Sequence, residues 1–300
     1  MELRPPTKDD ASAIVAVARS FGLSDETAAD VEAWFDLPSN DLENDARVAI
    51  VEGQVVGYGD VGDASSGGKT LWLDVRTGRD AAPLVLDWVE RRAREKAVEG
   101  AKLKAWSPEE NAEWRALLES KGFELHGYSF RMWIDLGQEL AAPAWPDGIS
   151  VQTYRRDEDE QAVYEAHQEA FSEEPDFSAD PFEDWKQWSY RAPFDPGLWF
   201  VAREGDEVAG ILLGRPRVLS QTERAGDATV GWINILGVRK PWRGRGLALA
   251  LLQHAFRAFE ERGKPRVGLG VDGRNPTAIR LYERAGMKPQ GTLEWYQKEV

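Results

Sequence analysis

The chain repeats one order of predicted elements, and this repeat restricts its fold more than any other feature. In each half, apolar β-branched runs that predict strands alternate with segments of helical periodicity. Two pairs of residues have the same spacing in both halves. Val75 and Gly100 are 25 positions apart, as are Val238 and Gly263. Asn111 and Gly122 are 11 positions apart, as are Asn275 and Gly286. We therefore predict an internal duplication of one α/β unit.

The repeat and the local composition set the predicted boundaries. We expect a first domain over residues 1–136, a linker over 137–148 that is rich in Pro, Ala and Gly, and a second domain over 149–300. At the end of the first domain, Phe123 to Ile134 is expected to form strands around a turn near His126 and Gly127. The last strand of the chain is expected near Leu293 to Gln297.

The second half carries a predicted strand, a glycine turn and a helix in succession. The run from Gly231 to Val238 reads as a buried strand, and apolar residues at four-residue steps after Leu247 predict a helix. Gly244 and Gly246 lie in the turn between this strand and this helix, and without side chains they leave the turn open to a ligand. Such a turn directs free N–H groups and the helix dipole at one point, where Arg243 and Arg245 add positive charge. We interpret it as a cradle for a diphosphate.

The turn is not one of the two best-known phosphate-binding motifs. A Rossmann fingerprint needs a third glycine and an earlier acid than Asp272, and a Walker loop needs a Lys-Ser/Thr pair. A second segment strengthens the case. Asn275 is a good N-cap and Pro276 suits the first helical position, while Gly286 ends this helix. Tyr282 lies two helical turns after Asn275.

Together these two segments resemble the GNAT N-acetyltransferases. Arg243-Gly-Arg-Gly-Leu-Ala248 is similar to the Gln/Arg-x-x-Gly-x-Gly/Ala signature of that family, and Asn275-Pro-x-Ala-x-x-Leu-Tyr-Glu-x-x-Gly286 is similar to its second cofactor motif. The resemblance implies an α/β (α+β) fold of two tandem GNAT, or acyl-CoA N-acyltransferase, domains. Each would be a mixed, mostly antiparallel sheet flanked by helices. Among tandem GNAT proteins, the organisation is most similar to that of the mycothiol synthases.

The resemblance also implies roles for residues of the second half. Leu236, Gly237 and Val238 would pair with the pantetheine arm of acetyl-CoA, and Asn275 would lie near that arm. Tyr282 would return a proton to the leaving thiolate, although a packed tyrosine bonded to the backbone is the alternative. The diphosphate would be held by the amides of Arg243, Gly244, Arg245, Gly246, Leu247 and Ala248.

The first half departs from these motifs where the chemistry would lie. Its turn, from Arg76 to Pro83, has a single glycine and contains Asp80, which would repel phosphate, and Leu118 stands where Tyr282 stands. We predict that this half has lost acetyl-CoA, packs on the second half and walls the substrate cleft. Binding of a different acyl carrier is the alternative.

The residue that would take a proton from the acceptor is harder to identify. Many GNAT proteins carry an acid on the central strand, whereas this strand has Asn234, which can orient water or substrate but cannot accept a proton. We take Glu173 as the candidate base, and Glu174 and Asp176 in the same loop are further candidates. Each of these acids could equally be a solvated surface charge, and His167 an ordinary helix residue.

Composition limits the partners and completes the expected function. A formal charge of −15 argues against general affinity for nucleic acid or an anionic membrane, and no segment predicts a signal peptide or a membrane span. The lack of cysteine excludes thiolate chemistry and is compatible with a reducing cytoplasm, and the three histidines form no metal spacing. We expect a cytoplasmic, metal-free monomer or homodimer that moves the acetyl group of acetyl-CoA to a primary amine of a small molecule by direct attack. Acetylation of protein N-termini, or a non-catalytic acetyl-CoA-binding regulatory module, are the alternatives.

Overall fold

The elements of the first half are those of one α/β unit. The structure is a computed structural model that describes residues 1–23, 26–63, 66–137, 139–174, 177–218 and 229–300. The first half comprises β1 (Glu2–Arg4), α1 (Ala11–Phe21), α2 (Ala28–Phe35), α3 (Leu42–Asp45), β2 (Ala46–Val51), β3 (Gln54–Gly62), β4 (Thr70–Thr77), α4 (Ala82–Lys96), β5 (Lys102–Pro108), α5 (Ala112–Ser120) and β6 (Glu124–Asp135).

The second half repeats this order except for the short α3, which confirms the predicted duplication of elements. Among the described helices of both halves, none is long and apolar enough to cross a membrane. The second half comprises β7 (Ile149–Thr153), α6 (Arg156–Phe171), α7 (Phe182–Ser189), β8 (Trp199–Glu204), β9 (Glu207–Val218), β10 (Thr229–Val238), α8 (Leu247–Glu261), β11 (Arg266–Asp272), α9 (Pro276–Arg284) and β12 (Lys288–Glu299).

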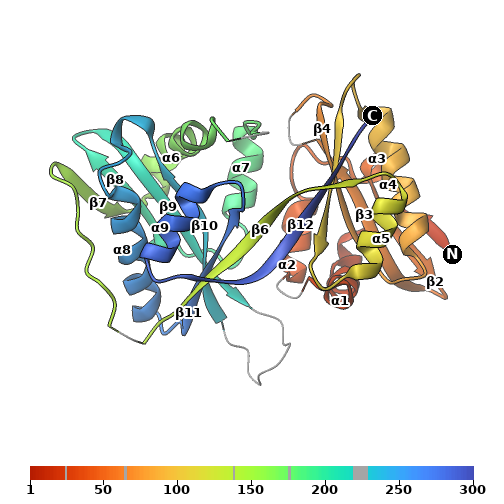
Figure 1. The fold of residues 1–300 in the computed structure, drawn as a ribbon, viewed down its shortest axis with the longest axis horizontal. Coiled ribbons are helices and arrows are strands. Elements are labelled where there is room, and N and C mark those ends of the chain that lie inside the picture. Colours follow the sequence, from red (N-terminus) through yellow and green to blue (C-terminus); the bar gives the residue numbers. More distant parts are fainter. Residues whose placement is uncertain (24–25, 64–65, 138, 175–176, 219–228) are drawn as a thin grey trace.

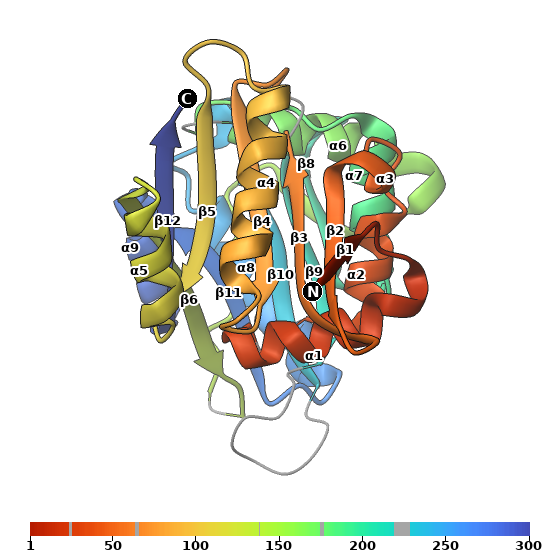
Figure 2. The same cartoon turned by 90° about the vertical axis from the view of Figure 1, so that its right-hand side faces the viewer.

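The two halves share one continuous sheet instead of forming two separate ones. The described strands make a 12-stranded sheet in the order β1-β2-β3-β4-β5-β12-β6-β11-β10-β9-β8-β7. Each half is mixed and mostly antiparallel, and among the described strands the parallel pairs are β4 with β5 and β10 with β11. In Figure 1, β6 and β12 cross between the halves. Figure 2 looks onto the first half, where α4 covers the outer face of its strands.

The final strand of each half lies in the sheet of the other half. β12 pairs with β5 of the first half, from Leu293 opposite Pro108 to Glu299 opposite Lys102. β6 pairs with β11 of the second half, from Asp135 opposite Arg266 onward. The predicted boundaries at residues 136 and 149 therefore divide the chain into repeats, but each repeat completes the sheet of its neighbour. Those boundaries remain a prediction.

This exchange corrects two details of the sequence prediction. The expected turn near His126 and Gly127 is wrong, because β6 runs without interruption from Glu124 to Asp135. The strand is continuous because it pairs with β12 along most of its length and with β11 from Ser129 to Asp135. For the same reason the last strand is longer than expected, since its first part pairs with β6 and its last part with both β6 and β5.

The helices on the outer faces lie close to the sheet because glycines face them. Helix α8 buries its apolar stripe on β9 and β10, and Phe259 is fully buried. A Cβ added at Gly231 would lie 2.6 Å from the Phe259 ring. In the first half, a Cβ at Gly59 would lie 2.7 Å from both Val85 and Val89 of α4. Removing the Phe259 ring would cost about 3–5 kcal/mol of folding free energy.

Candidate functional site

The central strands of the second half separate where the sequence predicted a binding site. β10 and β11 are paired only from Gly231 opposite Val267 to Ile233 opposite Leu269. Beyond that point β10 stays paired with β9 as far as Val238, while β11 stays paired with β6. Residues 234–238 therefore have one strand edge without a neighbouring strand among the described residues. Peptide groups on such an edge are available to an extended ligand.

A β-bulge marks the point of separation. Ile233 lies opposite Gly214 and Ile235 lies opposite Leu213, so Asn234 is an extra residue with no partner position on β9. A bulge bends its strand and redirects the side chain at that position. The Asn234 side chain is exposed, and it lines a cavity between the halves. The corresponding pair in the first half, β3 and β4, has an uninterrupted register.

The glycine turn holds the open conformation that the sequence predicted. Gly244 has a φ of +77° and Gly246, the N-cap of α8, has a φ of +89°, both in the left-handed region that favours glycine. A Cβ at either position would meet no heavy atom within 4 Å. Among the described residues, no acceptor bonds the amides of Gly244, Arg245 or Gly246. The turn therefore presents free N–H groups at the N-terminus of a 15-residue helix.

The basic side chains of the turn are engaged with acids of the same half. Arg243 pairs with Glu173, and its Nε donates to the carbonyl oxygen of Val238 at 3.0 Å. Arg245 pairs with Glu204 at 2.9 Å. These contacts fix the turn against β10, the end of β8 and the loop after α6. They also offset much of its formal charge. Attraction for an anion in this turn therefore depends mainly on the backbone amides and the helix dipole.

The N-cap of α9 connects the second motif to the loop after α6. The Asn275 Oδ1 accepts a hydrogen bond from the amide of Ala278 at 3.0 Å, as expected of a cap. Its Nδ2 donates to Glu174 Oε1 at 3.1 Å. Asn275 is thus held by both its helix and the loop, which fixes the start of α9 against the loop after α6.

Tyr282 is buried, yet its hydroxyl has no hydrogen-bond partner among the described residues. The side chain is 9% exposed and belongs to the core around α8 and α9. Burial and, to a lesser degree, the charge of Glu174 raise the pKa of Tyr282 to about 12. The phenol therefore keeps its proton at neutral pH. A tyrosine packed only for structure would usually bond its hydroxyl to a protein group, and this one does not.

The acids named as candidate bases lie beside the turn. Glu173 pairs with Lys240 at 2.8 Å as well as with Arg243, and these two cations hold the pKa of Glu173 below its usual value. A carboxylate with a lowered pKa is a weaker base, which weighs against Glu173 in that role. Glu174 is bonded to Asn275, and Asp176 lies outside the described residues.

The corresponding turn of the first half is built differently. Gly78 donates to Val56, and the amides of Ala81 and Ala82 donate to the carbonyl oxygen of Gly78. Gly78 does not have a positive φ, and Ala81 takes the N-cap position of α4. Leu118, which stands in the place of Tyr282, is fully buried. The amides of Gly78, Ala81 and Ala82 are thus used within the chain, and the first-half turn lacks the two left-handed glycines of the second.

A cavity of about 700 Å³ lies between the two halves. Asn234 and Trp232 of β10 form part of its wall, and Trp34 contacts Trp188 across the two halves with ring centroids 6.0 Å apart. Its size suits a small ligand. Charged side chains from both halves complete the wall, among them Glu26, Asp60, Asp74, Arg76, Arg191 and Arg215.

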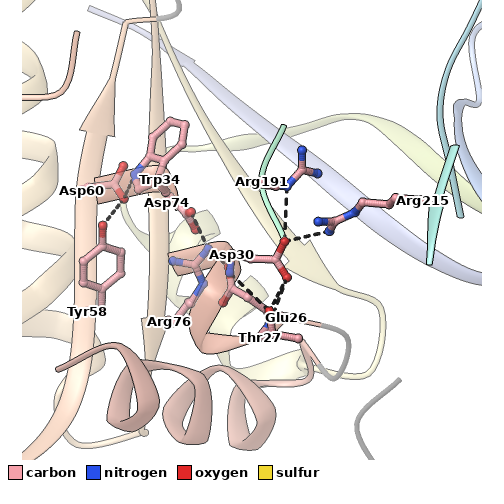
Figure 3. A network of polar contacts seen from close by, with 10 residues as sticks. All are labelled: Glu26, Thr27, Asp30, Trp34, Tyr58, Asp60, Asp74, Arg76, Arg191 and Arg215. Carbon is pink, nitrogen blue, oxygen red and sulfur yellow. Dashed lines mark hydrogen bonds and ion pairs between the residues drawn. The ribbon is translucent and has the colours of Figure 1, made fainter. Parts of the chain in front are cut away.

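One acid in this wall titrates close to neutral pH. Asp60 is 4% exposed and accepts hydrogen bonds from the Tyr58 hydroxyl at 2.5 Å and from Trp34 Nε1 at 3.1 Å (Figure 3). Burial, followed by the charge of Asp74 on the neighbouring strand, raises the pKa of Asp60 to about 8. Asp60 was not identified from the sequence, where its only signal is a charged residue within the apolar run of β3.

The second half contributes an arginine pair that was also missed. Arg215 of β9 and Arg191, which follows α7, both bond Asp30 of α2 (Figure 3). The sequence held one signal, because Arg215 and Arg217 alternate on a strand that is apolar up to Gly214. Charged residues on the inner face of such a strand indicate a polar cavity more than a core.

Comparison with known proteins agrees with this geometry. The profile of the acetyltransferase (GNAT) family matches residues 160–287. A mycothiol acetyltransferase of Acidothermus cellulolyticus is 30% identical over 199 residues, which cover 64% of this chain and 61% of that protein. The chain therefore spans less than two thirds of the length of this relative.

Two solved structures cover nearly the whole chain. A GCN5-related N-acetyltransferase from Sphaerobacter thermophilus has a TM-score of 0.74 and 30% identity, covering 99% of this chain and 95% of that one. A tandem GNAT protein from the clavulanic acid biosynthesis pathway has a TM-score of 0.69 at 19% identity, covering 99% and 98%. The second likeness concerns the fold alone, and it supports the tandem arrangement.

Proposed function

Because the chain belongs to the GCN5-related N-acetyltransferase family, we propose that it transfers the acetyl group of acetyl-CoA to a primary amine of a small molecule by direct attack. The observation that carries the proposal is the separation of β10 from β11 beside an open glycine turn. In the first half β4 also separates from β5 beyond Leu73, but this half lacks both the bulge and the left-handed glycines of the turn.

The described residues fit acetyl-CoA at two places. The amides from Gly244 to Ala248 would hold the diphosphate, in the space that is open around Gly244 and Gly246. The amide of Arg243, which the sequence also suggested, donates instead to the carbonyl oxygen of Lys240 at 3.3 Å. The unpaired edge at Leu236, Gly237 and Val238 would pair with the pantetheine arm. When bound, acetyl-CoA supplies an activated acetyl group and leaves as a thiolate that needs a proton.

The residues of the chain then have distinct tasks. A backbone amide at Leu236 or Val238 would donate to the thioester carbonyl oxygen, where negative charge develops in the transition state. The Tyr282 hydroxyl, protonated and free of other partners, would donate a proton to the sulfur. Asn234, at the bulge, would orient the acceptor amine or a water molecule. Because position 234 carries an amide and not a carboxylate, the proton of the amine would pass through water to carboxylate groups that line the cavity.

A small-molecule acceptor is favoured over a protein N-terminus. The relatives named mycothiol acetyltransferases act on a small molecule by name, and the cavity beside Asn234 is of the size that small ligands occupy. The cytoplasmic location, the lack of a metal or nucleic-acid partner, and the monomeric or dimeric state remain predictions from composition.

Release of free thiol from acetyl-CoA tests the proposal. The protein would be mixed with acetyl-CoA and a panel of small amines and N-terminal peptides, and products identified by mass spectrometry. We expect thiol release with at least one small amine and an N-acetylated product. Tight binding of acetyl-CoA without release for any amine would favour the regulatory module, and release with peptides alone would favour N-terminal acetylation.

A further inference from the structure

Two buried guanidinium groups share a single carboxylate in the wall of the cavity. Asp30 Oδ1 accepts from Arg215 Nη2 at 2.7 Å and from Arg191 Nε at 3.2 Å (Figure 3). Asp30, Arg191 and Arg215 are 7%, 8% and 5% exposed. This contact group therefore carries two positive charges against one negative charge at a site with little access to water.

The donors of Arg215 are only partly used. Its Nε and Nη1 are buried and have no hydrogen-bond partner within the described part of the chain. Arg191, by contrast, also donates from Nη1 to the carbonyl oxygen of Trp188 at 2.5 Å. A buried charged group without hydrogen-bond partners is costly, and native proteins rarely leave one unsatisfied without a functional reason.

Other acids in the same wall do not balance the excess charge by contact. Asp180 and Asp184 line the cavity near α7, but among the described residues neither forms an ion pair with Arg191 or Arg215. Burial and the neighbouring charge of Arg215 lower the pKa of Arg191 to about 9. This direction agrees with the geometry, since it reflects two cations that are close together and poorly solvated.

The arginine pair lies close to the expected reaction centre. Arg215 is directly opposite Trp232 in the register of β9 and β10, and opposite residues have Cβ atoms about 5 Å apart. Asn234 follows Trp232 by two positions, roughly 7 Å along the strand. All three residues line the same cavity. An acceptor with its amine at Asn234 could thus place a second group a few bonds away against Arg215.

We propose that Arg215 and Arg191 form an anion-binding subsite for the acceptor, which is then a small amine that also carries a carboxylate or a phosphate. Guanidinium groups suit both anions, because their planar N–H donors match two oxygens at once. That the bound anion belongs to the acetyl acceptor rests on the proposed acetyl transfer, but anion binding at the subsite can be tested without catalysis. The competing explanation is a purely structural ion cluster that joins the two halves.

Binding of simple anions to the full-length protein saturated with CoA tests the subsite, because CoA occupies its own diphosphate site. Glutarate and inorganic phosphate would be titrated at constant ionic strength by calorimetry. We expect saturable binding of at least one anion, weakened about 30-fold or more in Arg215→Met. Arg262→Met, which removes an arginine paired with Asp195 outside the cavity, should bind as the unchanged protein does. If Arg215→Met fails to fold, Arg215→Lys provides the test. This variant keeps the positive charge but loses the planar N–H donors of the guanidinium group, and it should also bind the anion more weakly.

Substitution of Asp30 separates binding from a structural role. Asp30→Asn keeps the volume and an acceptor for Thr27 but removes the carboxylate that competes for the arginines. We expect a less stable protein that binds the anion more tightly, by about tenfold. A structural cluster predicts the loss of stability without any gain in affinity. Absence of saturable binding in both the unchanged protein and Asp30→Asn, or equal affinity in Arg215→Met, would overturn the inference.

Matched amines then connect the subsite to the reaction. Ethanolamine phosphate would be compared with ethanolamine, and γ-aminobutyrate with its amide. We expect the acidic member of at least one pair to be acetylated with a higher kcat/KM, and Arg215→Met to remove that preference. Equal rates within both pairs would contradict the inference while supporting acetyl transfer. Anion binding without acetylation of any amine would contradict acetyl transfer while keeping the subsite.

Discussion

Substitution of Gly244 by alanine separates the binding role of the glycine turn from its contribution to folding. Gly244 has a φ of +77°, so alanine there would be strained, but its Cβ would meet no protein atom within 4 Å. Gly263 provides a matched control at the other end of α8. It has a φ of +67° and the same open surroundings.

The two substitutions should cost the same stability and differ in ligand affinity. A non-glycine residue in the left-handed region costs about 1–2 kcal/mol, which corresponds to a decrease of about 2–3 °C in Tm for a chain of 300 residues. At Gly244 the new methyl group would also occupy space that we assign to the diphosphate. Loss of one hydrogen bond to a charged group, about 1.5–3 kcal/mol, weakens CoA binding by roughly 10- to 150-fold.

Calorimetric titration with CoA and thermal unfolding of both variants provide the comparison. We expect Gly244→Ala and Gly263→Ala to have similar Tm values, with weaker CoA binding in Gly244→Ala alone. Equal CoA affinity in the two variants would refute the reasoning, because the open space at Gly244 would then have nothing to do with the diphosphate.

Three further variants test individual side chains. Tyr282→Phe should lower kcat by about 10²- to 10⁴-fold with CoA affinity unchanged; an unchanged kcat would return Tyr282 to a packing role. Glu173→Gln should change kcat/KM for the amine by less than about threefold, since its charge is used by Lys240 and Arg243; a loss in the range given for general bases would restore it as the base. The pKa of Asp60 in the folded protein is about 8, above its ordinary value. Between about pH 4 and 8 the folded state therefore binds more protons at Asp60 than the unfolded state does. The contribution of Asp60 to the free energy of unfolding thus falls as the pH rises through this interval. The free energy of unfolding of Asp60→Asn minus that of the unchanged protein should therefore increase over this interval, by at most about 1.4 kcal/mol per pH unit, in denaturant titrations; a constant difference would show that Asp60 titrates normally.

Local features of the site could be predicted from the sequence because each depends on a few adjacent residues. Gly244 and Gly246 allow positive φ, Asn275 caps its helix through the amide of Ala278, and the apolar spacing of α8 sets its buried face. The element order of the two halves follows from the same kind of local evidence. The positions of the glycine turn and the N-cap are therefore evident from the residues alone.

The exchange of β6 and β12 could not be predicted, because it is a choice between long-range partners. Leu293 pairs with Pro108 of the other half, and nothing in the alternation of either strand distinguishes this partner from one in its own half. The turn expected at His126 and Gly127 was wrong for the same reason. Glycine within a strand is a weak turn signal when a neighbouring strand continues the pairing, as β12 does opposite Gly127 and Leu125.

The sequence predicted a cleft walled by the first half, but the residues that line the cavity between the halves were beyond local reasoning. Asp30, Asp60 and Arg215 are far apart in the sequence, and although Asp60 and Arg215 stand out in apolar strands, no local pattern indicates that the three line one cavity. Only the shared sheet brings them together and buries them. The bulge at Asn234 belongs to the same class, since it exists only as a mismatch of register between β9 and β10.

A crystal structure of the protein with acetyl-CoA tests the central claim most directly. We predict one ligand per chain, with its diphosphate on the amides from Gly244 to Ala248 and its pantetheine arm along Leu236 to Val238. A diphosphate located on the turn between Gly78 and Ala82, or a ligand that leaves the edge of β10 uncovered, would contradict the account.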